Sequence, residues 1–289
     1  MTKKEFAEFI KNNKIVLLDG ATGTELAKRG MPLSASESMW VCEHPDITKE
    51  IKKGYLDAGS QIIYAPTFSS NREKLKSFGA ENDIERLNRT AVEITREVVG
   101  DKALLAGDIG MSGVMLEPYG DYEYDALVDV YKEQMDILAK AGCDLLVIET
   151  MMNLEEMEAA LEAAAAVCEL PVMATMTFEE HGKTLYGVTP EAAAEALIAK
   201  GADAIGANCS TGPDKMLAVI EKFAAVSTVP VIAKPNAGLP TPLPDGGVRY
   251  DVEPEEFVEN MKAIIEAGAT IVGGCCGTTP EYIKKLKTI

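Results

Sequence analysis

The sequence predicts an α/β fold, a single (β/α)8 TIM barrel over residues 1–289. Two observations lead to this prediction. First, short apolar runs alternate with longer segments of helical periodicity along the chain, and strands that are apolar on both faces form parallel sheets covered by helices on both sides. Second, there are eight such units in 289 residues. This favours a closed barrel, which typically takes about 250 residues, over an open doubly wound sheet.

Each expected strand is an apolar run, and each expected helix places apolar residues on one face. The strands are KIVLLD at 14–19, QIIYAP at 61–66, ALLAGD at 103–108, DLLVIE at 144–149, PVMATMT at 171–177, DAIGANC at 203–209, PVIAKP at 230–235 and ATIVGG at 269–274. The helices are 46–58, 82–99, 124–141, 154–168, 190–200, 213–226, 254–267 and 280–287. Glycines that suit left-handed caps end four helices, at Gly59, Gly142, Gly201 and Gly268. Proline suits the first turn of three helices, at Pro190, Pro254 and Pro280.

The composition narrows the classes of partner and compartment. Hydrophobic residues at 47% and charged residues at 26% are typical of a soluble globular enzyme. A formal charge of −18 argues against nucleic acid and against an anionic membrane surface, because both attract clustered Lys and Arg. The N-terminus has the pattern of a short amphipathic helix rather than a signal peptide, and no apolar run is long enough to span a membrane. Six cysteines are too few for a secreted disulfide scaffold, so a cytoplasmic protein is expected.

In barrels of this kind the chemistry lies at the C-terminal ends of the strands. The two longest expected loops, 20–45 and 236–253, lie on that face and are expected to cover or line a site. The rule selects a small set of polar residues and cysteines: Asp19, Thr67, Asp108, Glu149, Thr177, Cys209, Asn236, Cys275 and Cys276.

Three of the six cysteines fall at this mouth, Cys209 at the end of the sixth strand and Cys275 with Cys276 after the eighth. Because only one strand separates the sixth from the eighth, the three thiolates are within reach of one ion. Zinc held by three thiolates, with the fourth tetrahedral position open, is a catalytic arrangement. The usual CxxC spacing is absent, so the residues alone also allow a vicinal disulfide, a nucleophilic Cys209 or simple packing.

The remaining cysteines and both histidines are expected to be inert. Cys42, Cys143 and Cys168 are interpreted as small buried residues or unreactive thiols. His44, in an EHP loop, and His181, in a polar EEHGK turn, are interpreted as solvated rather than ligating.

An open zinc–thiolate site has one main chemical consequence. A substrate thiol in the fourth position loses its proton at neutral pH, whereas a free thiol with a pKa of about 8.5 stays mostly protonated. Three anionic sulfur ligands also keep that fourth sulfur nucleophilic and are poorly suited to making zinc hydroxide. Thiol alkylation is therefore favoured over hydrolysis.

Several segments resemble the homocysteine S-methyltransferase family. They are DGATGTEL at 19–26, TF at 67–68, ET at 149–150, GANCSTGP at 206–213, PNAGLP at 235–240 and GGCCGTTPEYI at 273–283. The resemblance implies that Cys209, Cys275 and Cys276 are the zinc ligands. It also implies that Asp19 and Glu149 hold the amino group of homocysteine, and two carboxylates at strand ends suit an ammonium group.

The resemblance gives the remaining pocket residues as well. Thr67 and Phe68 resemble part of the family's substrate pocket. Asn208 and Asn236 are expected to orient loops at the mouth through amide hydrogen bonds. Backbone N–H groups within 20–24, or near Gly274, are the two candidates for the substrate carboxylate.

The methyl donor is expected to be a methylated cobalamin. GANCSTGP and PNAGLP resemble the homocysteine domain of cobalamin-dependent methionine synthase more than the S-methylmethionine or betaine branches, which stay as alternatives. That branch implies methylcobalamin carried by a corrinoid protein or cobalamin domain. The sequence holds no second barrel and no cobalamin module. The donor is therefore expected on a separate protein or on another part of a longer chain.

Two other functions stay open. A phosphate-binding barrel would use Gly273, Gly274 and the helix start that follows, although no Lys or Arg ends the eighth strand and two cysteines stand there. A non-catalytic subunit that binds zinc or a corrinoid protein would have no need of Asp19 and Glu149.

Overall fold

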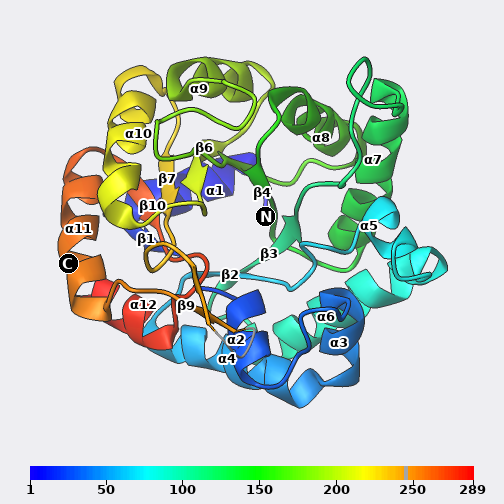
Figure 1. Cartoon of the computed structure of the whole chain (residues 1–289), viewed down its shortest axis with the longest axis horizontal. Coiled ribbons are helices and arrows are strands. Elements are labelled where there is room, and N and C mark those ends of the chain that lie inside the picture. Colours follow the sequence, from blue (N-terminus) through cyan, green and yellow to red (C-terminus); the bar gives the residue numbers. More distant parts are fainter. Residues whose placement is uncertain (244–246) are drawn as a thin grey trace.

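The computed structural model describes residues 1–243 and 247–289, in which parallel strands form a barrel inside a ring of helices (Figure 1). Within these residues, eight strands pair in the order β1-β10-β7-β6-β5-β4-β3-β2, all in parallel. A parallel bridge between Leu18 and Ile62 joins the two ends of that order. The barrel is therefore closed, which confirms the predicted fold and excludes the open sheet.

The barrel strands lie on the predicted apolar runs. Six are shorter than predicted, whereas β3 has the predicted length and β4 is one residue longer. They are β1 Val16–Leu17, β2 Ile62–Tyr64, β3 Leu104–Ile109, β4 Leu145–Met151, β5 Val172–Met176, β6 Ala204–Asn208, β7 Val231–Lys234 and β10 Ala269–Val272. Alternate side chains point to opposite faces. One set, which includes Val16, Leu18 and Ile62, fills the barrel interior. The other set packs beneath the helices in a second, larger cluster.

The predicted outer helices are all present: α4 Pro45–Ala58, α6 Ile84–Val99, α7 Tyr124–Lys140, α8 Leu154–Val167, α9 Pro190–Ala199, α10 Pro213–Val226, α11 Pro254–Glu266 and α12 Pro280–Leu286. The predicted glycine caps have φ values of 109° at Gly59, 95° at Gly142, 86° at Gly201 and 119° at Gly268. These left-handed values confirm the caps. No helix of the described ranges is long and apolar enough to cross a bilayer.

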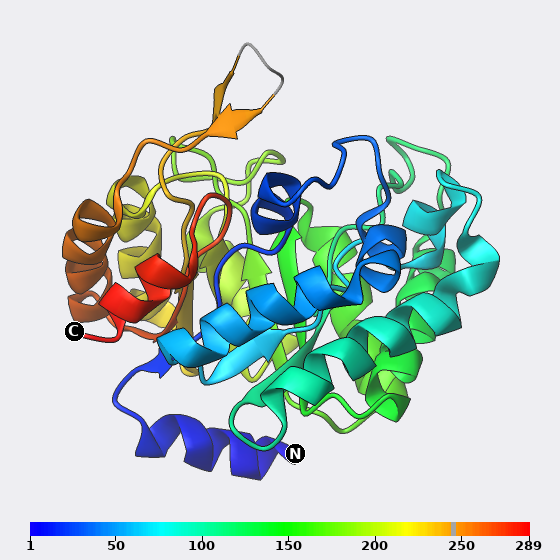
Figure 2. The same ribbon diagram turned by 90° about the horizontal axis from the view of Figure 1, so that it is seen from below.

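The N-terminal amphipathic helix is also confirmed. It is α1 Lys3–Asn12, whose Phe6 and Ile10 join the cluster inside the barrel. Figure 2 shows α1 at one end of the barrel, with a β-hairpin projecting at the other. Apolar side chains of α1 therefore close the barrel at the N-terminal ends of the strands, which leaves the C-terminal ends for a substrate site.

Both expected long loops contain secondary structure that the sequence analysis did not predict. Segment 20–45 holds α2 Gly23–Lys28 and α3 Glu37–Glu43, and segment 236–253 holds the hairpin of β8 Thr241–Pro242 and β9 Val248–Arg249. Residues 244–246 of the second segment lie outside the described residues. The segment after β2 adds α5 Arg72–Lys76 and the short helix η1 Glu81–Asp83. Cys42, expected in a loop, therefore lies on α3, where only a few turns of helical pattern were available to detect it.

Candidate active site

A cavity of about 290 Å³ lies at the C-terminal ends of the barrel strands. Seven strands contribute a polar or sulfur-containing side chain to its wall: Asp19 after β1, Tyr64 on β2, Asp108 on β3, Glu149 on β4, Cys209 after β6, Lys234 on β7, and Cys275 with Cys276 after β10. The cavity therefore draws its lining from every barrel strand except β5, and the rule that chemistry lies at the C-terminal ends of the strands selected the correct end.

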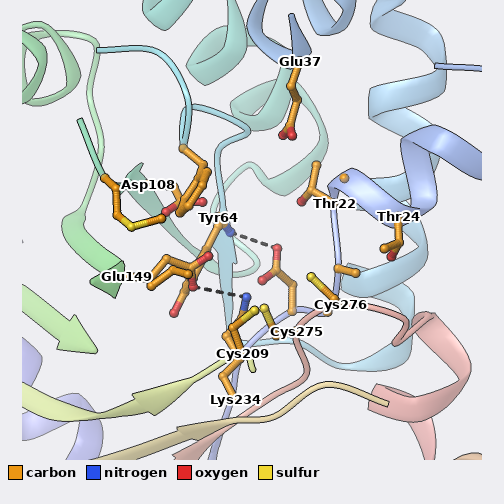
Figure 3. Close-up of a pocket in the computed structure, with 17 residues that line it drawn as sticks. Thr22, Thr24, Glu37, Tyr64, Asp108, Glu149, Cys209, Lys234, Cys275 and Cys276 are labelled. Atoms are coloured by element: carbon orange, nitrogen blue, oxygen red, sulfur yellow. Dashed lines mark hydrogen bonds and ion pairs between the residues drawn. The ribbon is translucent and has the colours of Figure 1, made fainter. Parts of the chain in front are cut away.

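The three mouth cysteines converge. Their Sγ atoms all lie within 4.8 Å of one another. In the described ranges, these three cysteines are the one group of three or more potential ligand side chains close enough together to hold a metal ion. Figure 3 shows the three sulfur atoms facing one another at the wall of the pocket. Each cysteine is a free thiol, so this structure does not contain the vicinal disulfide.

Main-chain hydrogen bonds to the end of β7 and to the turn after it bring these cysteines together. The Cys209 N–H donates to the Lys234 carbonyl at 3.1 Å, and the Cys275 N–H donates to the Pro235 carbonyl at 2.7 Å. The Cys276 carbonyl accepts from the Ala237 N–H at 2.9 Å. The end of β7 and the PNAGLP turn thus hold both cysteine segments through main-chain hydrogen bonds.

The backbone at the site is strained. Thr150, Cys209 and Ser210 have φ values of 64°, 63° and 60°, in the left-handed region that non-glycine residues seldom occupy. Each such residue costs on the order of 1 kcal/mol or more, and strain of this kind persists where surrounding contacts enforce it. At Thr150 the Asn208 side chain enforces it: Oδ1 accepts from the Thr150 N–H at 2.8 Å, and Nδ2 donates to the Thr150 hydroxyl at 2.7 Å.

The three thiols share hydrogen bonds in a way that separates their acidities. Hydrogen bonds from Cys209 and Cys275 lower the pKa of the Cys276 thiol to about 3. The hydrogen bonds to Cys275 and Cys276, together with burial, raise the pKa of Cys209 well above its ordinary value. A cluster of this kind favours one thiolate, and a cation is needed to stabilise three.

Asp19 is an anchored carboxylate with one free oxygen. Its Oδ2 accepts from Lys52 Nζ at 3.2 Å and from the Tyr64 N–H at 3.1 Å, and both Asp19 and Lys52 are fully buried. Lys52 also donates to the Thr22 hydroxyl at 2.8 Å. Oδ1 of Asp19 is buried and has no hydrogen-bond partner within residues 1–243 and 247–289.

Glu149 faces a buried lysine. Lys234 Nζ lies 3.5 Å from Glu149 Oε2 and 4.5 Å from the ring centroid of Tyr64. Burial raises the pKa of Glu149 to about 7, and the Lys234 cation opposes that rise. Burial acts to lower the pKa of Lys234, but the Glu149 carboxylate and other anions outweigh it and raise the pKa well above its usual value. Lys234 therefore stays charged while Glu149 titrates near neutrality.

Comparison with known proteins decides the family. The family model described as "Homocysteine S-methyltransferase" matches residues 16–289. The chain belongs to the homocysteine S-methyltransferase family. This confirms the family resemblance that the motifs around the mouth indicated.

Two curated relatives are methionine synthases, in agreement with the branch indicated by the motifs. The enzyme of Mycobacterium leprae is 31% identical over 291 residues, which cover 94% of this chain and 24% of the relative. That of Mycobacterium tuberculosis is 30% identical over 295 residues, with 96% and 25% covered. The chain thus spans about a quarter of the length of these relatives.

A solved structure has the same fold. The homocysteine methyltransferase MmuM from Escherichia coli, in its metallated form, aligns with a TM-score of 0.82 at 24% identity. The alignment covers 97% of this chain and 98% of that chain. MmuM in an oxidised form aligns with a TM-score of 0.80. These alignments support the barrel architecture over its full length.

Of the four side chains Thr67, Phe68, Asn208 and Asn236, which the family resemblance also singled out, Phe68 lines the cavity. Thr67 is fully buried beside it, and its hydroxyl accepts from the Asp108 N–H at 3.0 Å and donates to the Asp108 carbonyl at 2.8 Å. Asn208 and Asn236 are buried behind the wall. The amide of Asn208 holds Thr150, whereas Oδ1 of Asn236 has no partner in the described part of the chain.

Both glycines considered for a phosphate are explained by packing. A Cβ atom at Gly273 would lie 2.7 Å from the Leu18 side chain, and one at Gly274 would lie 2.4 Å from the Thr278 hydroxyl. The Gly274 N–H donates to the Asp19 carbonyl at 3.2 Å. The turn after β10 therefore needs glycine in order to lie against β1.

The histidines and the other cysteines lie away from the sulfur cluster. His44 stacks on Trp40 with ring centroids 4.0 Å apart, and His181 lies in an exposed turn. Cys143 is buried, and burial raises its pKa to about 12. Burial also raises the pKa values of Cys42 and Cys168, which leaves all three as protonated thiols at neutral pH.

Lys234 and Tyr64 line the pocket but were not predicted as site residues from the sequence. Both lie inside runs that were assigned as apolar strands, PVIAKP and QIIYAP. The available signal for Lys234 was a charge at the C-terminal end of a strand otherwise free of charge, which a buried parallel strand tolerates only with a partner.

Proposed function

We propose that this chain transfers a methyl group to the thiol of L-homocysteine, giving methionine, with zinc held by Cys209, Cys275 and Cys276. The observation that supports this most directly is the convergence of the three Sγ atoms within 4.8 Å at the mouth of the barrel. Membership of the homocysteine S-methyltransferase family supports homocysteine as the acceptor. The methionine synthase relatives support methionine as the product.

The three cysteines fit zinc on the chemistry of the donor set. Zinc–sulfur bonds of about 2.3 Å in a tetrahedron place sulfur atoms about 3.8 Å apart. Sulfur atoms that all lie within 4.8 Å of one another need only small rotations to reach that spacing. Three soft thiolates favour zinc over magnesium or calcium, which prefer oxygen ligands. Zinc when bound would stabilise the thiolate form of the substrate sulfur.

The side chains around the cavity bind and orient the substrate. Asp19 Oδ1 and the Glu149 carboxylate are available to the α-ammonium group, because Lys52 and Lys234 occupy the other oxygen of each acid. Residues 20–24 line the cavity and are our candidates for the substrate carboxylate. The Gly274 N–H, the other candidate, already donates to Asp19. Phe68 and Tyr64 supply an apolar wall for the methylene groups.

In the methyl transfer, a lone pair of the substrate thiolate forms the new sulfur–carbon bond. The bond between the methyl carbon and the donor breaks at the same time, and its electron pair leaves with the donor. The protein contributes by holding the sulfur at the wall of the cavity so that the methyl carbon approaches in line.

The donor we propose is methylcobalamin carried by a partner protein or by another domain of a longer chain. The methionine synthase relatives, which are about four times as long as the aligned region, support this choice over S-methylmethionine or betaine. We also propose a cytoplasmic location, which free cysteines support.

A donor panel tests the proposal. Zinc-loaded protein is incubated with homocysteine and, separately, methylcobalamin, S-methylmethionine, betaine or S-adenosylmethionine, and methionine is measured by mass spectrometry. We expect methionine with methylcobalamin. Methionine with S-methylmethionine or betaine alone would replace the proposed donor. Homocysteine that neither binds nor reacts would leave the non-catalytic subunit as the better description.

A further inference from the structure

We infer that Asp108 is a specificity residue of this pocket: its buried, unpartnered carboxylate oxygen receives the α-ammonium group of the amino acid substrate. The inference rests on the proposed function and deepens it, because it names a third carboxylate that selects α-amino thiols over thiols without an amino group. Figure 3 shows the carboxylates of Asp108 and Glu149 on the same side of the pocket.

Asp108 has a hydrogen-bond acceptor that no described residue uses. Asp108 is 6% exposed and lines the cavity, and its Oδ1 atom has no hydrogen-bond donor in the part of the chain that the structure describes. Buried polar atoms are nearly always hydrogen-bonded, so such an atom in the wall of a cavity points to a ligand donor. Asp19 lines the same cavity, and its Oδ1 atom is likewise buried and unpartnered among the described residues.

Asp108 also lacks the positively charged partner that the two neighbouring acids have among the described residues. Lys52 pairs with Asp19 at 3.2 Å, and Lys234 pairs with Glu149 at 3.5 Å. Asp108 forms no ion pair with any described residue, although it is buried and the charges of both pairs act on it. A buried carboxylate without a counter-charge is unfavourable. The ammonium group of the substrate supplies the missing positive charge.

The main chain of Asp108 is held in place by hydrogen bonds. The Thr67 hydroxyl holds the Asp108 main chain on both sides, through its N–H at 3.0 Å and its carbonyl at 2.8 Å. Beside it, a Cβ atom at Gly110 would lie 2.4 Å from the Phe68 ring, so glycine is needed for Phe68 to pack over the strand end. The carboxylate is thus presented from a fixed backbone beside an apolar ring, where a charged hydrogen bond is strong.

The acidity of Asp108 agrees with this role. Burial and the nearby Glu149 carboxylate raise the pKa of Asp108 well above its ordinary range. A cationic ligand reverses this effect, because it stabilises the ionised form. Glu37 also lines the pocket, but it is only half-buried. It serves as a matched control for pocket charge.

The test compares two thiols that differ only in the amino group, homocysteine and 4-mercaptobutanoate. Their affinities for zinc-loaded wild-type protein, Asp108→Asn and Glu37→Gln are measured by isothermal titration calorimetry. We expect Asp108→Asn to weaken homocysteine binding about tenfold or more. We expect its affinity for 4-mercaptobutanoate, and its zinc content, to stay close to wild type. Glu37→Gln should keep the preference for homocysteine.

Two results would overturn the inference. One is an unchanged preference for homocysteine in Asp108→Asn. The other is an equal loss of preference in Glu37→Gln, which would point to the general field of the pocket instead of a contact. Asp108→Ser provides a second uncharged variant if the asparagine form folds poorly. Failure of the wild-type protein to bind homocysteine would remove the proposed function itself, whereas wild-type binding with unchanged variant selectivity removes only the role of Asp108.

Discussion

Lys234 Nζ and Glu149 Oε2 lie 3.5 Å apart inside the cavity, on side chains that are 5% and 9% exposed. The two residues are on strands β7 and β4, three positions apart around the barrel. The pair sets the charge state of the pocket, because the lysine keeps the neighbouring carboxylate partly ionised near neutral pH. It also leaves one oxygen of Glu149 for a second cation.

Substrate-site affinity should depend on pH through Glu149. Its pKa is raised to about 7, mainly by burial, so the carboxylate is neutral below that pH and ionised above it. An ammonium ligand needs the ionised form. We therefore expect the affinity for methionine to rise as pH increases through about 7 and then to level off. Methionine is used because it has no thiol to titrate, and calorimetry from pH 6 to 8.5 is the measurement.

Glu149→Gln provides the control for this pH dependence. It keeps the shape of the side chain and removes the titration, so its methionine affinity should be low and nearly constant over the same range. A variant that keeps the wild-type pH profile would assign the titration to another group.

Replacement of Lys234 should shift the pH dependence of methionine binding. In Lys234→Met the Glu149 carboxylate loses the cation that lowers its pKa, so its pKa should rise and the midpoint of methionine binding should shift to higher pH. At pH 7 the affinity should fall because less Glu149 is ionised. A midpoint that stays in place or moves to lower pH would contradict the role assigned to Lys234.

The barrel and the sulfur cluster could be predicted from sequence because each depends on local patterns. Apolar runs and helix caps gave the eight units, and the position of a residue at a strand end placed Cys209 and the 275–276 pair on one face. The main-chain bonds from β7 then bring them together, and β7 lies between β6 and β10 in the barrel order. No side-chain detail was needed for this step.

The contacts between buried polar side chains could not be predicted from the sequence, because they depend on whether each side chain points into the cavity or away from it. Lys234 and Glu149 are 85 residues apart, and only the closed barrel brings them together. Thr67 and Phe68 are neighbours in the sequence, yet Phe68 lines the cavity and Thr67 binds the Asp108 backbone beneath it. The short helix α3 was missed because its signals, the Ser36 cap and the buried Trp40 and Val41, are few.

Zinc binding should require each cysteine of the cluster. Cys209→Ala, Cys275→Ala and Cys276→Ala each remove one of three sulfur ligands, and we expect loss of tight zinc binding with the barrel intact. Metal content after dialysis gives the stoichiometry. Replacement with cobalt gives a sulfur-to-metal absorption band that reports the ligands directly. The control is Cys168→Ala, at the end of α8 and away from the cluster, which should keep one zinc per chain. Stoichiometric zinc in any of the three cluster variants would remove that cysteine from the ligand set.

The strained turn beside the cluster should depend on Asn208. Its amide holds Thr150 through two hydrogen bonds and accepts a third from the Thr175 hydroxyl at 2.8 Å. Asn208→Leu leaves those buried groups without partners, and we expect a loss of about 2–4 kcal/mol in the free energy of unfolding. Urea denaturation of the metal-free protein measures it. Asn82→Leu, at an exposed position, should change stability by less than about 0.5 kcal/mol. Equal stability of the two variants would show that the left-handed conformation of Thr150 is held by other contacts.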